Sequence, residues 1–207
     1  VRHIGDGGGQ AEAHPPRRFE IQLPPSTIAA LSRSPGPVSI SPDGKKLAVA
    51  LTPEGTAQTS VWIHTFENSK WIEVENGLGG NNPFWSPDSS EVGYFRLSSI
   101  WKTRADGTQS QAVCRTTELS GQGAWSPNGT IVFTGLSQPL RKVPASGGEP
   151  EPLSKLDEPE LRHSWPQFLP DGDHFLYTSI GANASDSTVY LSSLSNPAIR
   201  KPLFKAH

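Results

Sequence analysis

The stretch Val38-Ser39-Ile40-Ser41-Pro42-Asp43-Gly44, followed by Lys45-Lys46-Leu47-Ala48-Val49-Ala50, decides the fold. Two runs of strand-forming residues flank a short turn-forming segment. Proline fixes φ at about −65° early in the turn, and glycine accepts the positive φ that the end of the turn requires. The aspartate between them can bond the local backbone. The stretch therefore predicts a β-hairpin.

The same phrase occurs three more times, within residues 83–95, 124–134 and 167–178. Successive motif prolines are 45, 40 and 43 residues apart. A four-stranded propeller blade repeats at about 40–45 residues. Two more strand-like runs follow each hairpin, at 60–66 and 70–74 in the first period. We therefore expect an all-β chain, a β-propeller of four-stranded antiparallel blades with about four blades present.

The recurring turn residues are interpreted as structural. They are Pro42, Asp43 and Gly44, then Pro87 and Asp88, then Pro127, Asn128 and Gly129, and finally Pro170, Asp171 and Gly172. The three aspartates stand a whole blade apart, so a turn role is expected rather than a metal cluster. Ser89, Asn128 and Leu169 depart from the Ser-Pro-Asp-Gly pattern and should weaken the turn geometry locally.

The repeat also sets the expected boundaries. We expect a flexible linker at 1–17, an N-terminal strand and lead-in at 18–35, and blades at 36–78, 79–118, 119–157 and 158–207. The chain opens on Val1 and has no Met, which favours a fragment of a larger ring over an unusual start codon. Residues 19–23 could then supply the strand that closes this ring. A self-contained ring of four blades is the alternative.

Composition excludes several function classes. The net charge is −2 and charged residues make up 18% of the chain, which argues against an electrostatic nucleic-acid binder. No apolar run approaches the roughly 20 residues that a membrane span needs, and no signal peptide is visible. The single Cys114 excludes an internal disulfide framework. The histidines show no ligand spacing, so neither a metal nor a cofactor is expected.

Residues 41–48 resemble the PD40 repeat, the WD40-like repeat of TolB-type β-propellers, and the resemblance covers roughly residues 36–204. Residues 163–177, with 18–24, are similar to the propellers that lie C-terminal to the membrane span of bacterial serine/threonine protein kinases. The resemblance implies a non-catalytic sensor module that binds a ligand or protein outside the cytoplasm. The alternatives are a TolB-like periplasmic interaction scaffold and the gating propeller of a prolyl-oligopeptidase-type serine peptidase.

Binding residues are expected on the polar loops that lead into the innermost strands. Asn81, Asn82, Gln122, Arg162 and His163 are predicted to form a polar rim for a protein or small ligand. The alternative is that these residues only cap strand ends.

Trp85, Trp125 and Phe168 precede their turns at equivalent positions, which indicates packing between blades, with an aromatic ligand cage as the alternative. The chain has no Gly-x-Ser-x-Gly elbow and none of the protein-kinase motifs. The segment itself is therefore not expected to be catalytic, although the parent protein could carry a kinase domain.

Overall fold

The computed structural model describes residues 20–29, 38–117, 121–135 and 137–206, and these form four antiparallel β-sheets. The first contains β2 (Ser39–Ile40), β3 (Lys46–Pro53), β4 (Ser60–Thr65) and β5 (Lys70–Leu78), with β1 (Thr27–Ala29) beside β3. The second contains β6 (Gly80–Trp85), β7 (Glu91–Arg96), β8 (Ser99–Arg104) and β9 (Gln111–Arg115). The third contains β10 (Gln122–Trp125), β11 (Thr130–Thr134), β12 (Arg141–Pro144) and β13 (Glu151–Pro152). The fourth contains β14 (Glu160–Phe168), β15 (His174–Gly181), β16 (Thr188–Ser193) and β17 (Lys201–Lys205), and the short 3-10 helix η1 (Ala184–Asp186) precedes β16.

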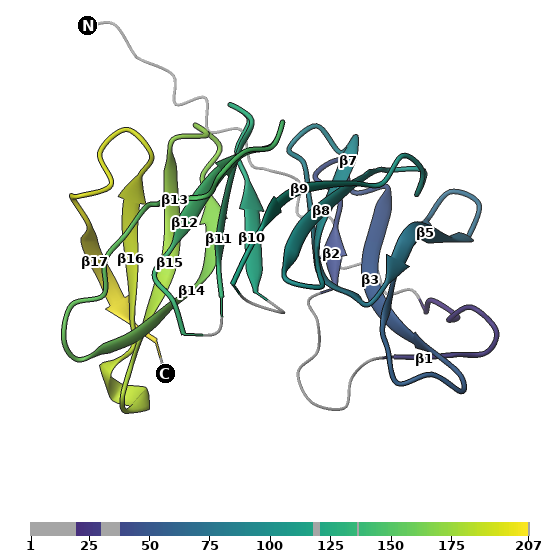
Figure 1. The fold of residues 1–207 in the computed structure, drawn as a ribbon, viewed down its shortest axis with the longest axis horizontal. Coiled ribbons are helices and arrows are strands. Elements are labelled where there is room, and N and C mark those ends of the chain that lie inside the picture. Colours follow the sequence, from purple (N-terminus) through teal and green to yellow (C-terminus); the bar gives the residue numbers. More distant parts are fainter. Residues whose placement is uncertain (1–19, 30–37, 118–120, 136, 207) are drawn as a thin grey trace, which may run out of the picture.

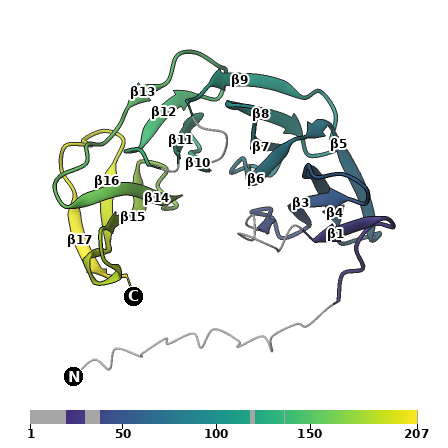
Figure 2. The ribbon, with the colours of Figure 1, turned by 60° about the horizontal axis from the view of Figure 1, so that its bottom comes forward.

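Each sheet runs in chain order from an inner to an outer strand, which is the order of a propeller blade. The sheets stand side by side in Figure 1. Figure 2 shows that they follow an arc, with β6, β10 and β14 on its concave side and β9, β13 and β17 on its convex side. The first and fourth blades stand apart at the two ends of the arc. The predicted all-β architecture of antiparallel four-stranded blades is confirmed.

Three apolar cores lie between neighbouring blades rather than inside any one of them. The core between the first and second blades includes Val61 and Ile63 from one side and Trp85 and Tyr94 from the other. The next core contains Phe84, Phe95, Ile100, Val113, Cys114, Trp125, Ile131, Phe133, Val143 and Ala145. The third joins Val132, Leu140 and Leu153 to Phe175 and Tyr177. Because each blade buries its apolar faces only against its neighbours, stability depends on stacking the repeats.

The predicted turns form with a shared hydrogen-bond pattern. In the first blade the Ser41 hydroxyl donates to the Asp43 carboxylate (2.6 Å), and Gly44 N donates to Ser41 O at a φ of 71°. The second blade repeats the first bond between Ser86 and Asp88 at 2.6 Å. These hydroxyl bonds, followed by backbone N–H bonds, lower the pKa of both aspartates. The turn aspartates therefore act locally, as expected.

The departures from the turn pattern are compensated within the structure. Ser89 adopts the left-handed φ of 62° that a glycine would favour, and its hydroxyl accepts a hydrogen bond from Asp43 N in the neighbouring blade. Where Leu169 replaces the motif serine, the imidazole of His174 lies 2.7 Å from the Asp171 carboxylate instead. Ser126 donates across the blade junction to Gly172 O. One departure, Ser89, and one regular motif serine, Ser126, thus form contacts between blades.

The lead-in segment joins the first blade. β1 pairs with the end of β3, at the same edge where β2 pairs with the beginning of β3. Residues 20–24 form no strand, and Gln22 O accepts a hydrogen bond from the Trp71 indole at 2.8 Å. A strand at 19–23 is therefore not found over 20–23, while Phe19 lies outside the described residues. Closure of a larger ring by this segment stays a prediction, because it requires further blades.

Candidate functional site

A hollow lies at the centre of the arc, where the inner strands of all four blades meet. Its volume is about 750 Å³, within the usual range for a small-molecule site. It is lined by Val38, Ser39, Ile40, Pro42, Asn82, Pro83, Phe84, Trp85, Pro87, Gln122, Gly123, Ala124, Trp125, Pro127, Trp165, Pro166, Gln167, Phe168, Leu169 and Pro170. We call this hollow the central groove. None of these lining residues carries a charge.

Three equivalent positions of the repeat stand three residues before the last residue of the inner strand: Asn82, Gln122 and Trp165. Each of the first two side chains bonds to the backbone of the next blade. Asn82 Nδ2 donates to Gly121 O at 2.6 Å, and Gln122 Oε1 accepts from Trp165 N at 2.9 Å. Asn82 and Gln122 therefore line the groove and tie the blades together, while the binding role predicted for them stays a prediction.

Trp165 occupies the third of these positions and behaves differently. The register shifts between Ser164 and Gln167, and Trp165 has a left-handed φ of 53°. Asn82 has a φ of 48° at the equivalent shift, but asparagine tolerates this conformation and a bulky residue rarely adopts it. The Trp165 side chain is 56% exposed at the groove. Backbone strain at an exposed aromatic residue beside a cavity is typical of ligand-contact positions.

The other aromatic residues of the repeat are mostly buried. Trp85 and Trp125 are 6% and 9% exposed and belong to the cores between blades, as predicted. The Trp85 indole also donates to Ser39 O of the first blade at 2.9 Å. Phe168 is half-buried and packs against the core between the third and fourth blades. All three residues also line the groove.

The remaining predicted site residues lie away from the groove. Asn81 is paired with Phe95 on β7, and Arg162 is paired with Ile180 on β15, both half-buried. His163 is fully buried at 0% exposure. The prediction of His163 as an accessible rim residue is therefore wrong, because its ring points into the junction of the third and fourth blades.

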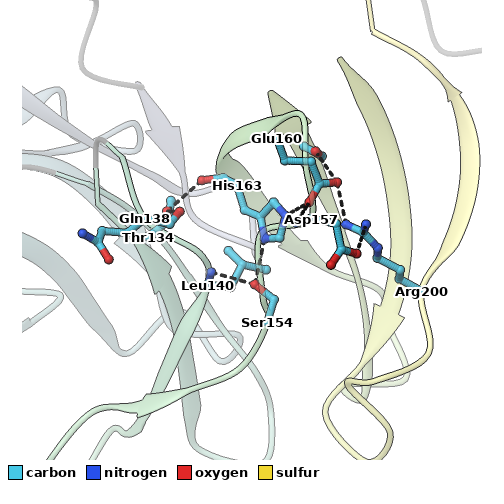
Figure 3. A network of polar contacts seen from close by, with 9 residues as sticks. Thr134, Gln138, Leu140, Ser154, Asp157, Glu160, His163 and Arg200 are labelled. Carbon is cyan, nitrogen blue, oxygen red and sulfur yellow. Dashed lines mark hydrogen bonds and ion pairs between the residues drawn. The ribbon is translucent and has the colours of Figure 1, made fainter. Parts of the chain in front are cut away.

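His163 is held by the third blade on several sides (Figure 3). Its carbonyl accepts from the Thr134 hydroxyl at 2.7 Å, and its N–H donates to Gln138 O at 3.1 Å. Its Nδ1 lies 2.7 Å from the Ser154 hydroxyl, which also accepts from Leu140 N at 2.8 Å. This set of bonds fixes the start of β14 against the preceding blade.

The other side of the His163 ring meets a carboxylate network (Figure 3). Nε2 lies 3.3 Å from Glu160 Oε2, while Glu160 Oε1 accepts from Ser179 at 2.7 Å and from Arg200 at 2.6 Å. Arg200 also bonds Asp157 at 2.7 Å. Burial would raise the pKa of Glu160, but the hydrogen bonds outweigh it and hold that pKa below its usual value. The carboxylate therefore stays charged opposite Arg200.

Burial lowers the pKa of His163, so its ring is neutral near pH 7. The neutral His163 ring makes both of its hydrogen bonds when the Ser154 hydroxyl donates to Nδ1 and Nε2–H donates to Glu160. The set contains a serine, a histidine and a carboxylate, but no residue of it lines the central groove. Because the fully buried ring leaves no place for a substrate, the arrangement serves to join blades.

The single cysteine, Cys114, is buried and is not activated as a nucleophile. Burial raises the pKa of Cys114 to about 11, which keeps the thiol protonated. No group of three or more His, Cys, Asp or Glu residues is placed to hold a metal ion in the described part of the chain. Within the same ranges, no helix is long and apolar enough to span a membrane.

Sequence reasoning missed Trp165, Gln167 and the groove that they share with the inner strands. A signal was present, because Asn82-Pro83 and Trp165-Pro166 occupy equivalent positions of the repeat. A residue before proline is restricted in its backbone. A tryptophan at this point, where the second and third blades carry amides, marks the fourth blade as different.

Comparison with known proteins identifies the fold. No family model and no curated protein matches the sequence. Among solved structures, TolB from Acinetobacter baumannii is similar with a TM-score of 0.63 and 16% identity, over 81% of this chain and 43% of that one. A chain of a nidogen/laminin complex has a TM-score of 0.61 and 13% identity, over 80% of this chain and 63% of that one.

The β-propeller domain of the trilobed protease from Pyrococcus furiosus, described as having an open velcro topology, is also similar. Its TM-score is 0.53 at 14% identity, over 76% of this chain and 54% of that one. The chain thus spans less than two thirds of the length of each of these proteins. At such identities the likeness concerns the fold alone, and it agrees with the blade order in the structure: the chain is an arc of a β-propeller.

Proposed function

We propose that this chain is a non-catalytic interaction module that binds a protein or small ligand in the central groove. The observation that carries the proposal is the groove itself, where the inner strands of four blades converge on about 750 Å³ with an exposed, strained Trp165 at its edge. The similarity to a chain of a nidogen/laminin complex, a protein–protein assembly, supports a binding role.

The test compares two glutamine-to-lysine variants in affinity capture from an extract of the source cells, with the captured proteins and metabolites identified by mass spectrometry. Gln167→Lys places a charge in the groove, while Gln111→Lys places it on the exposed outer strand β9. We expect one bound species to be lost with Gln167→Lys and retained with Gln111→Lys and the unaltered chain. Equal retention by both variants would remove the groove as the binding site.

The more specific role, the extracytoplasmic sensor of a serine/threonine protein kinase, rests on the sequence resemblance. The flanking coding sequence tests it. A kinase domain followed by a span of about 20 apolar residues upstream would support the sensor. A signal peptide directly upstream would instead favour a TolB-like periplasmic scaffold, and a downstream Gly-x-Ser-x-Gly motif would favour a peptidase gate.

We also propose that the arc belongs to a larger ring. Phe175, Tyr177 and Tyr190 face the third blade, so the alternating Leu176 and Val189 face the opposite side, with Phe204 paired to Val189 and 61% exposed. At the three described junctions such faces are covered by the next blade. Further repeats at the same period in the coding sequence on either side of these 207 residues would support the larger ring, and the absence of such repeats on both sides would refute it.

A further inference from the structure

The chemistry of the groove wall restricts what it can hold. Six of the twenty described lining residues are prolines and five are aromatic. The only polar side chains among them are Ser39, Asn82, Gln122 and Gln167, and none is charged. A charged ligand would lose its hydration here without gaining a counter-charge. The wall therefore fits an uncharged ligand with a large apolar surface.

The hydrogen-bonding groups left in the groove are few, and donors are prominent among them. The amides of Asn82 and Gln122 are engaged with neighbouring blades. The Trp165 indole N–H and the Gln167 amide make no hydrogen bond to another residue in the described ranges. An indole is a donor only, and an amide offers two donors. A ligand that presents acceptors at intervals along an apolar surface would satisfy them.

A proline-rich segment in the polyproline II conformation has these properties. Its backbone carries carbonyl acceptors and lacks N–H donors, and its rings are apolar. Such segments dock in grooves lined by aromatic residues, where their preformed shape reduces the entropy lost on binding. A neutral oligosaccharide suits the wall less well, because its many hydroxyl groups would find few partners and would stay unsatisfied.

Trp165 is pre-arranged for such a contact. The register shift in β14 holds the Trp165 backbone in the left-handed region. The backbone N–H of Trp165 also donates to the Gln122 side chain of the adjacent blade. Because the backbone is already fixed, placing the indole ring against a ligand in the groove costs little further conformational entropy. A fixed, exposed tryptophan is a frequent centre of binding energy at interfaces.

We propose that the central groove binds an extended, uncharged, proline-rich peptide segment, with Trp165 packing on a proline ring and donating its indole N–H to a peptide carbonyl. This inference rests on the proposed interaction function and specifies its ligand.

The experiment titrates the purified chain with the capped peptide acetyl-(Pro)10-amide by isothermal titration calorimetry, with tryptophan fluorescence as a second readout. We expect saturable binding that changes less than about twofold between low and high salt, because no lining charge contributes. Trp165→Ala should weaken binding at least about tenfold, as for an interface hot spot. Trp165→Phe, which keeps a ring but loses the donor, should weaken it about fivefold.

Ile199→Ala is the matched control, because Ile199 is 65% exposed and lies outside the groove. It should bind the peptide like the unaltered chain, and circular dichroism should show the same fold for all variants. Absence of binding at about 1 mM peptide would overturn the inference. Binding by Trp165→Ala that equals the unaltered chain, or binding of cellohexaose in place of the peptide, would also overturn it. Any of these results would refute the proline-rich ligand alone. The proposed interaction function is tested separately by the capture experiment with Gln167→Lys, which uses no proline peptide.

Discussion

Gly93→Ala should destabilise the second and third blades through a clash with a single ring. Phe84 lies between Gly93, its cross-strand partner on β7, and Gly123 on β10 of the next blade. A Cβ at Gly93 would overlap the Cζ and Cε2 atoms of the Phe84 ring, and a Cβ at Gly123 would lie 2.5 Å from Cε1. Ordinary carbon–carbon contacts are about 3.5–4.0 Å.

The ring cannot move aside easily, because Phe84 is 7% exposed and packs against Phe95 and Trp125 with ring centroids 6.4 Å apart in each pair. Overpacking of this kind costs about 1–3 kcal/mol. A loss of 1 kcal/mol lowers the melting temperature of a domain this size by about 2–4 °C. We therefore expect Gly93→Ala to melt about 2–12 °C below the unaltered chain.

A double-mutant cycle tests whether the Phe84 ring causes the loss of stability in Gly93→Ala. Phe84→Ala alone should cost about 3–5 kcal/mol. In that background the added methyl group enters the cavity, and alanine is favoured over glycine in a strand by about 0.5–1 kcal/mol. Gly93→Ala should then be neutral or stabilising in urea unfolding monitored by tryptophan fluorescence. If it costs the same free energy with and without Phe84, the contact is not the cause and the reasoning fails.

Three further predictions concern the turns and the blade junction. Ser89→Ala should be about 1 kcal/mol less stable in urea than Ser89→Gly, because both lose the bond to Asp43 N but only alanine keeps the left-handed strain; equal stabilities would contradict this. The native pKa values of Asp43, Asp88 and Asp171 are lowered, so the unfolded chain binds more protons as the pH falls through about 4, and stability declines there. Replacing all three by Asn, which the third blade already carries, should flatten this decline in melting temperatures measured from pH 3 to 6, and an unchanged slope would refute the assignment. The native pKa of His163 is also lowered, so stability should fall as the pH drops below about 6.5, and His163→Gln should reduce this dependence between pH 5 and 8.

The architecture could be predicted because the turn chemistry is local. Ser-Pro-Asp-Gly specifies a turn from φ preferences and one hydroxyl–carboxylate bond, and the bond forms in the structure between Ser41 and Asp43. Its repetition then gives the blade period. The packing roles of Trp85 and Trp125 followed from the same logic, since equivalent positions of a repeat meet equivalent neighbours.

The site was predicted only in part, because its residues acquire their roles from neighbouring blades. His163 looks like a loop residue in sequence, yet it is enclosed by Ser154 of the third blade and by Glu160 of its own strand, β14. The pairing of β1 with β3 likewise depends on the edge that β2 leaves unpaired. Neither the burial of His163 against the third blade nor the pairing of β1 belongs to the repeat, so periodicity could not reveal them.

Departures from the repeat locate what is particular to this chain, because the shared residues are explained by the blade itself. At the position of Gly93 the other described blades carry Ala48, Val132 and Leu176, and the residue opposite the glycine, Phe84, is the largest of the four opposite residues. The Phe84 ring fills the space that a side chain at position 93 would need, so no ligand is required to explain the glycine. Trp165 has no such compensation. It replaces an amide that would bond the next blade, accepts a strained backbone, and leaves most of its ring exposed. A substitution that adds strain without adding a contact inside the described blades points to a contact beyond them, with a bound ligand or with the next blade of the larger ring.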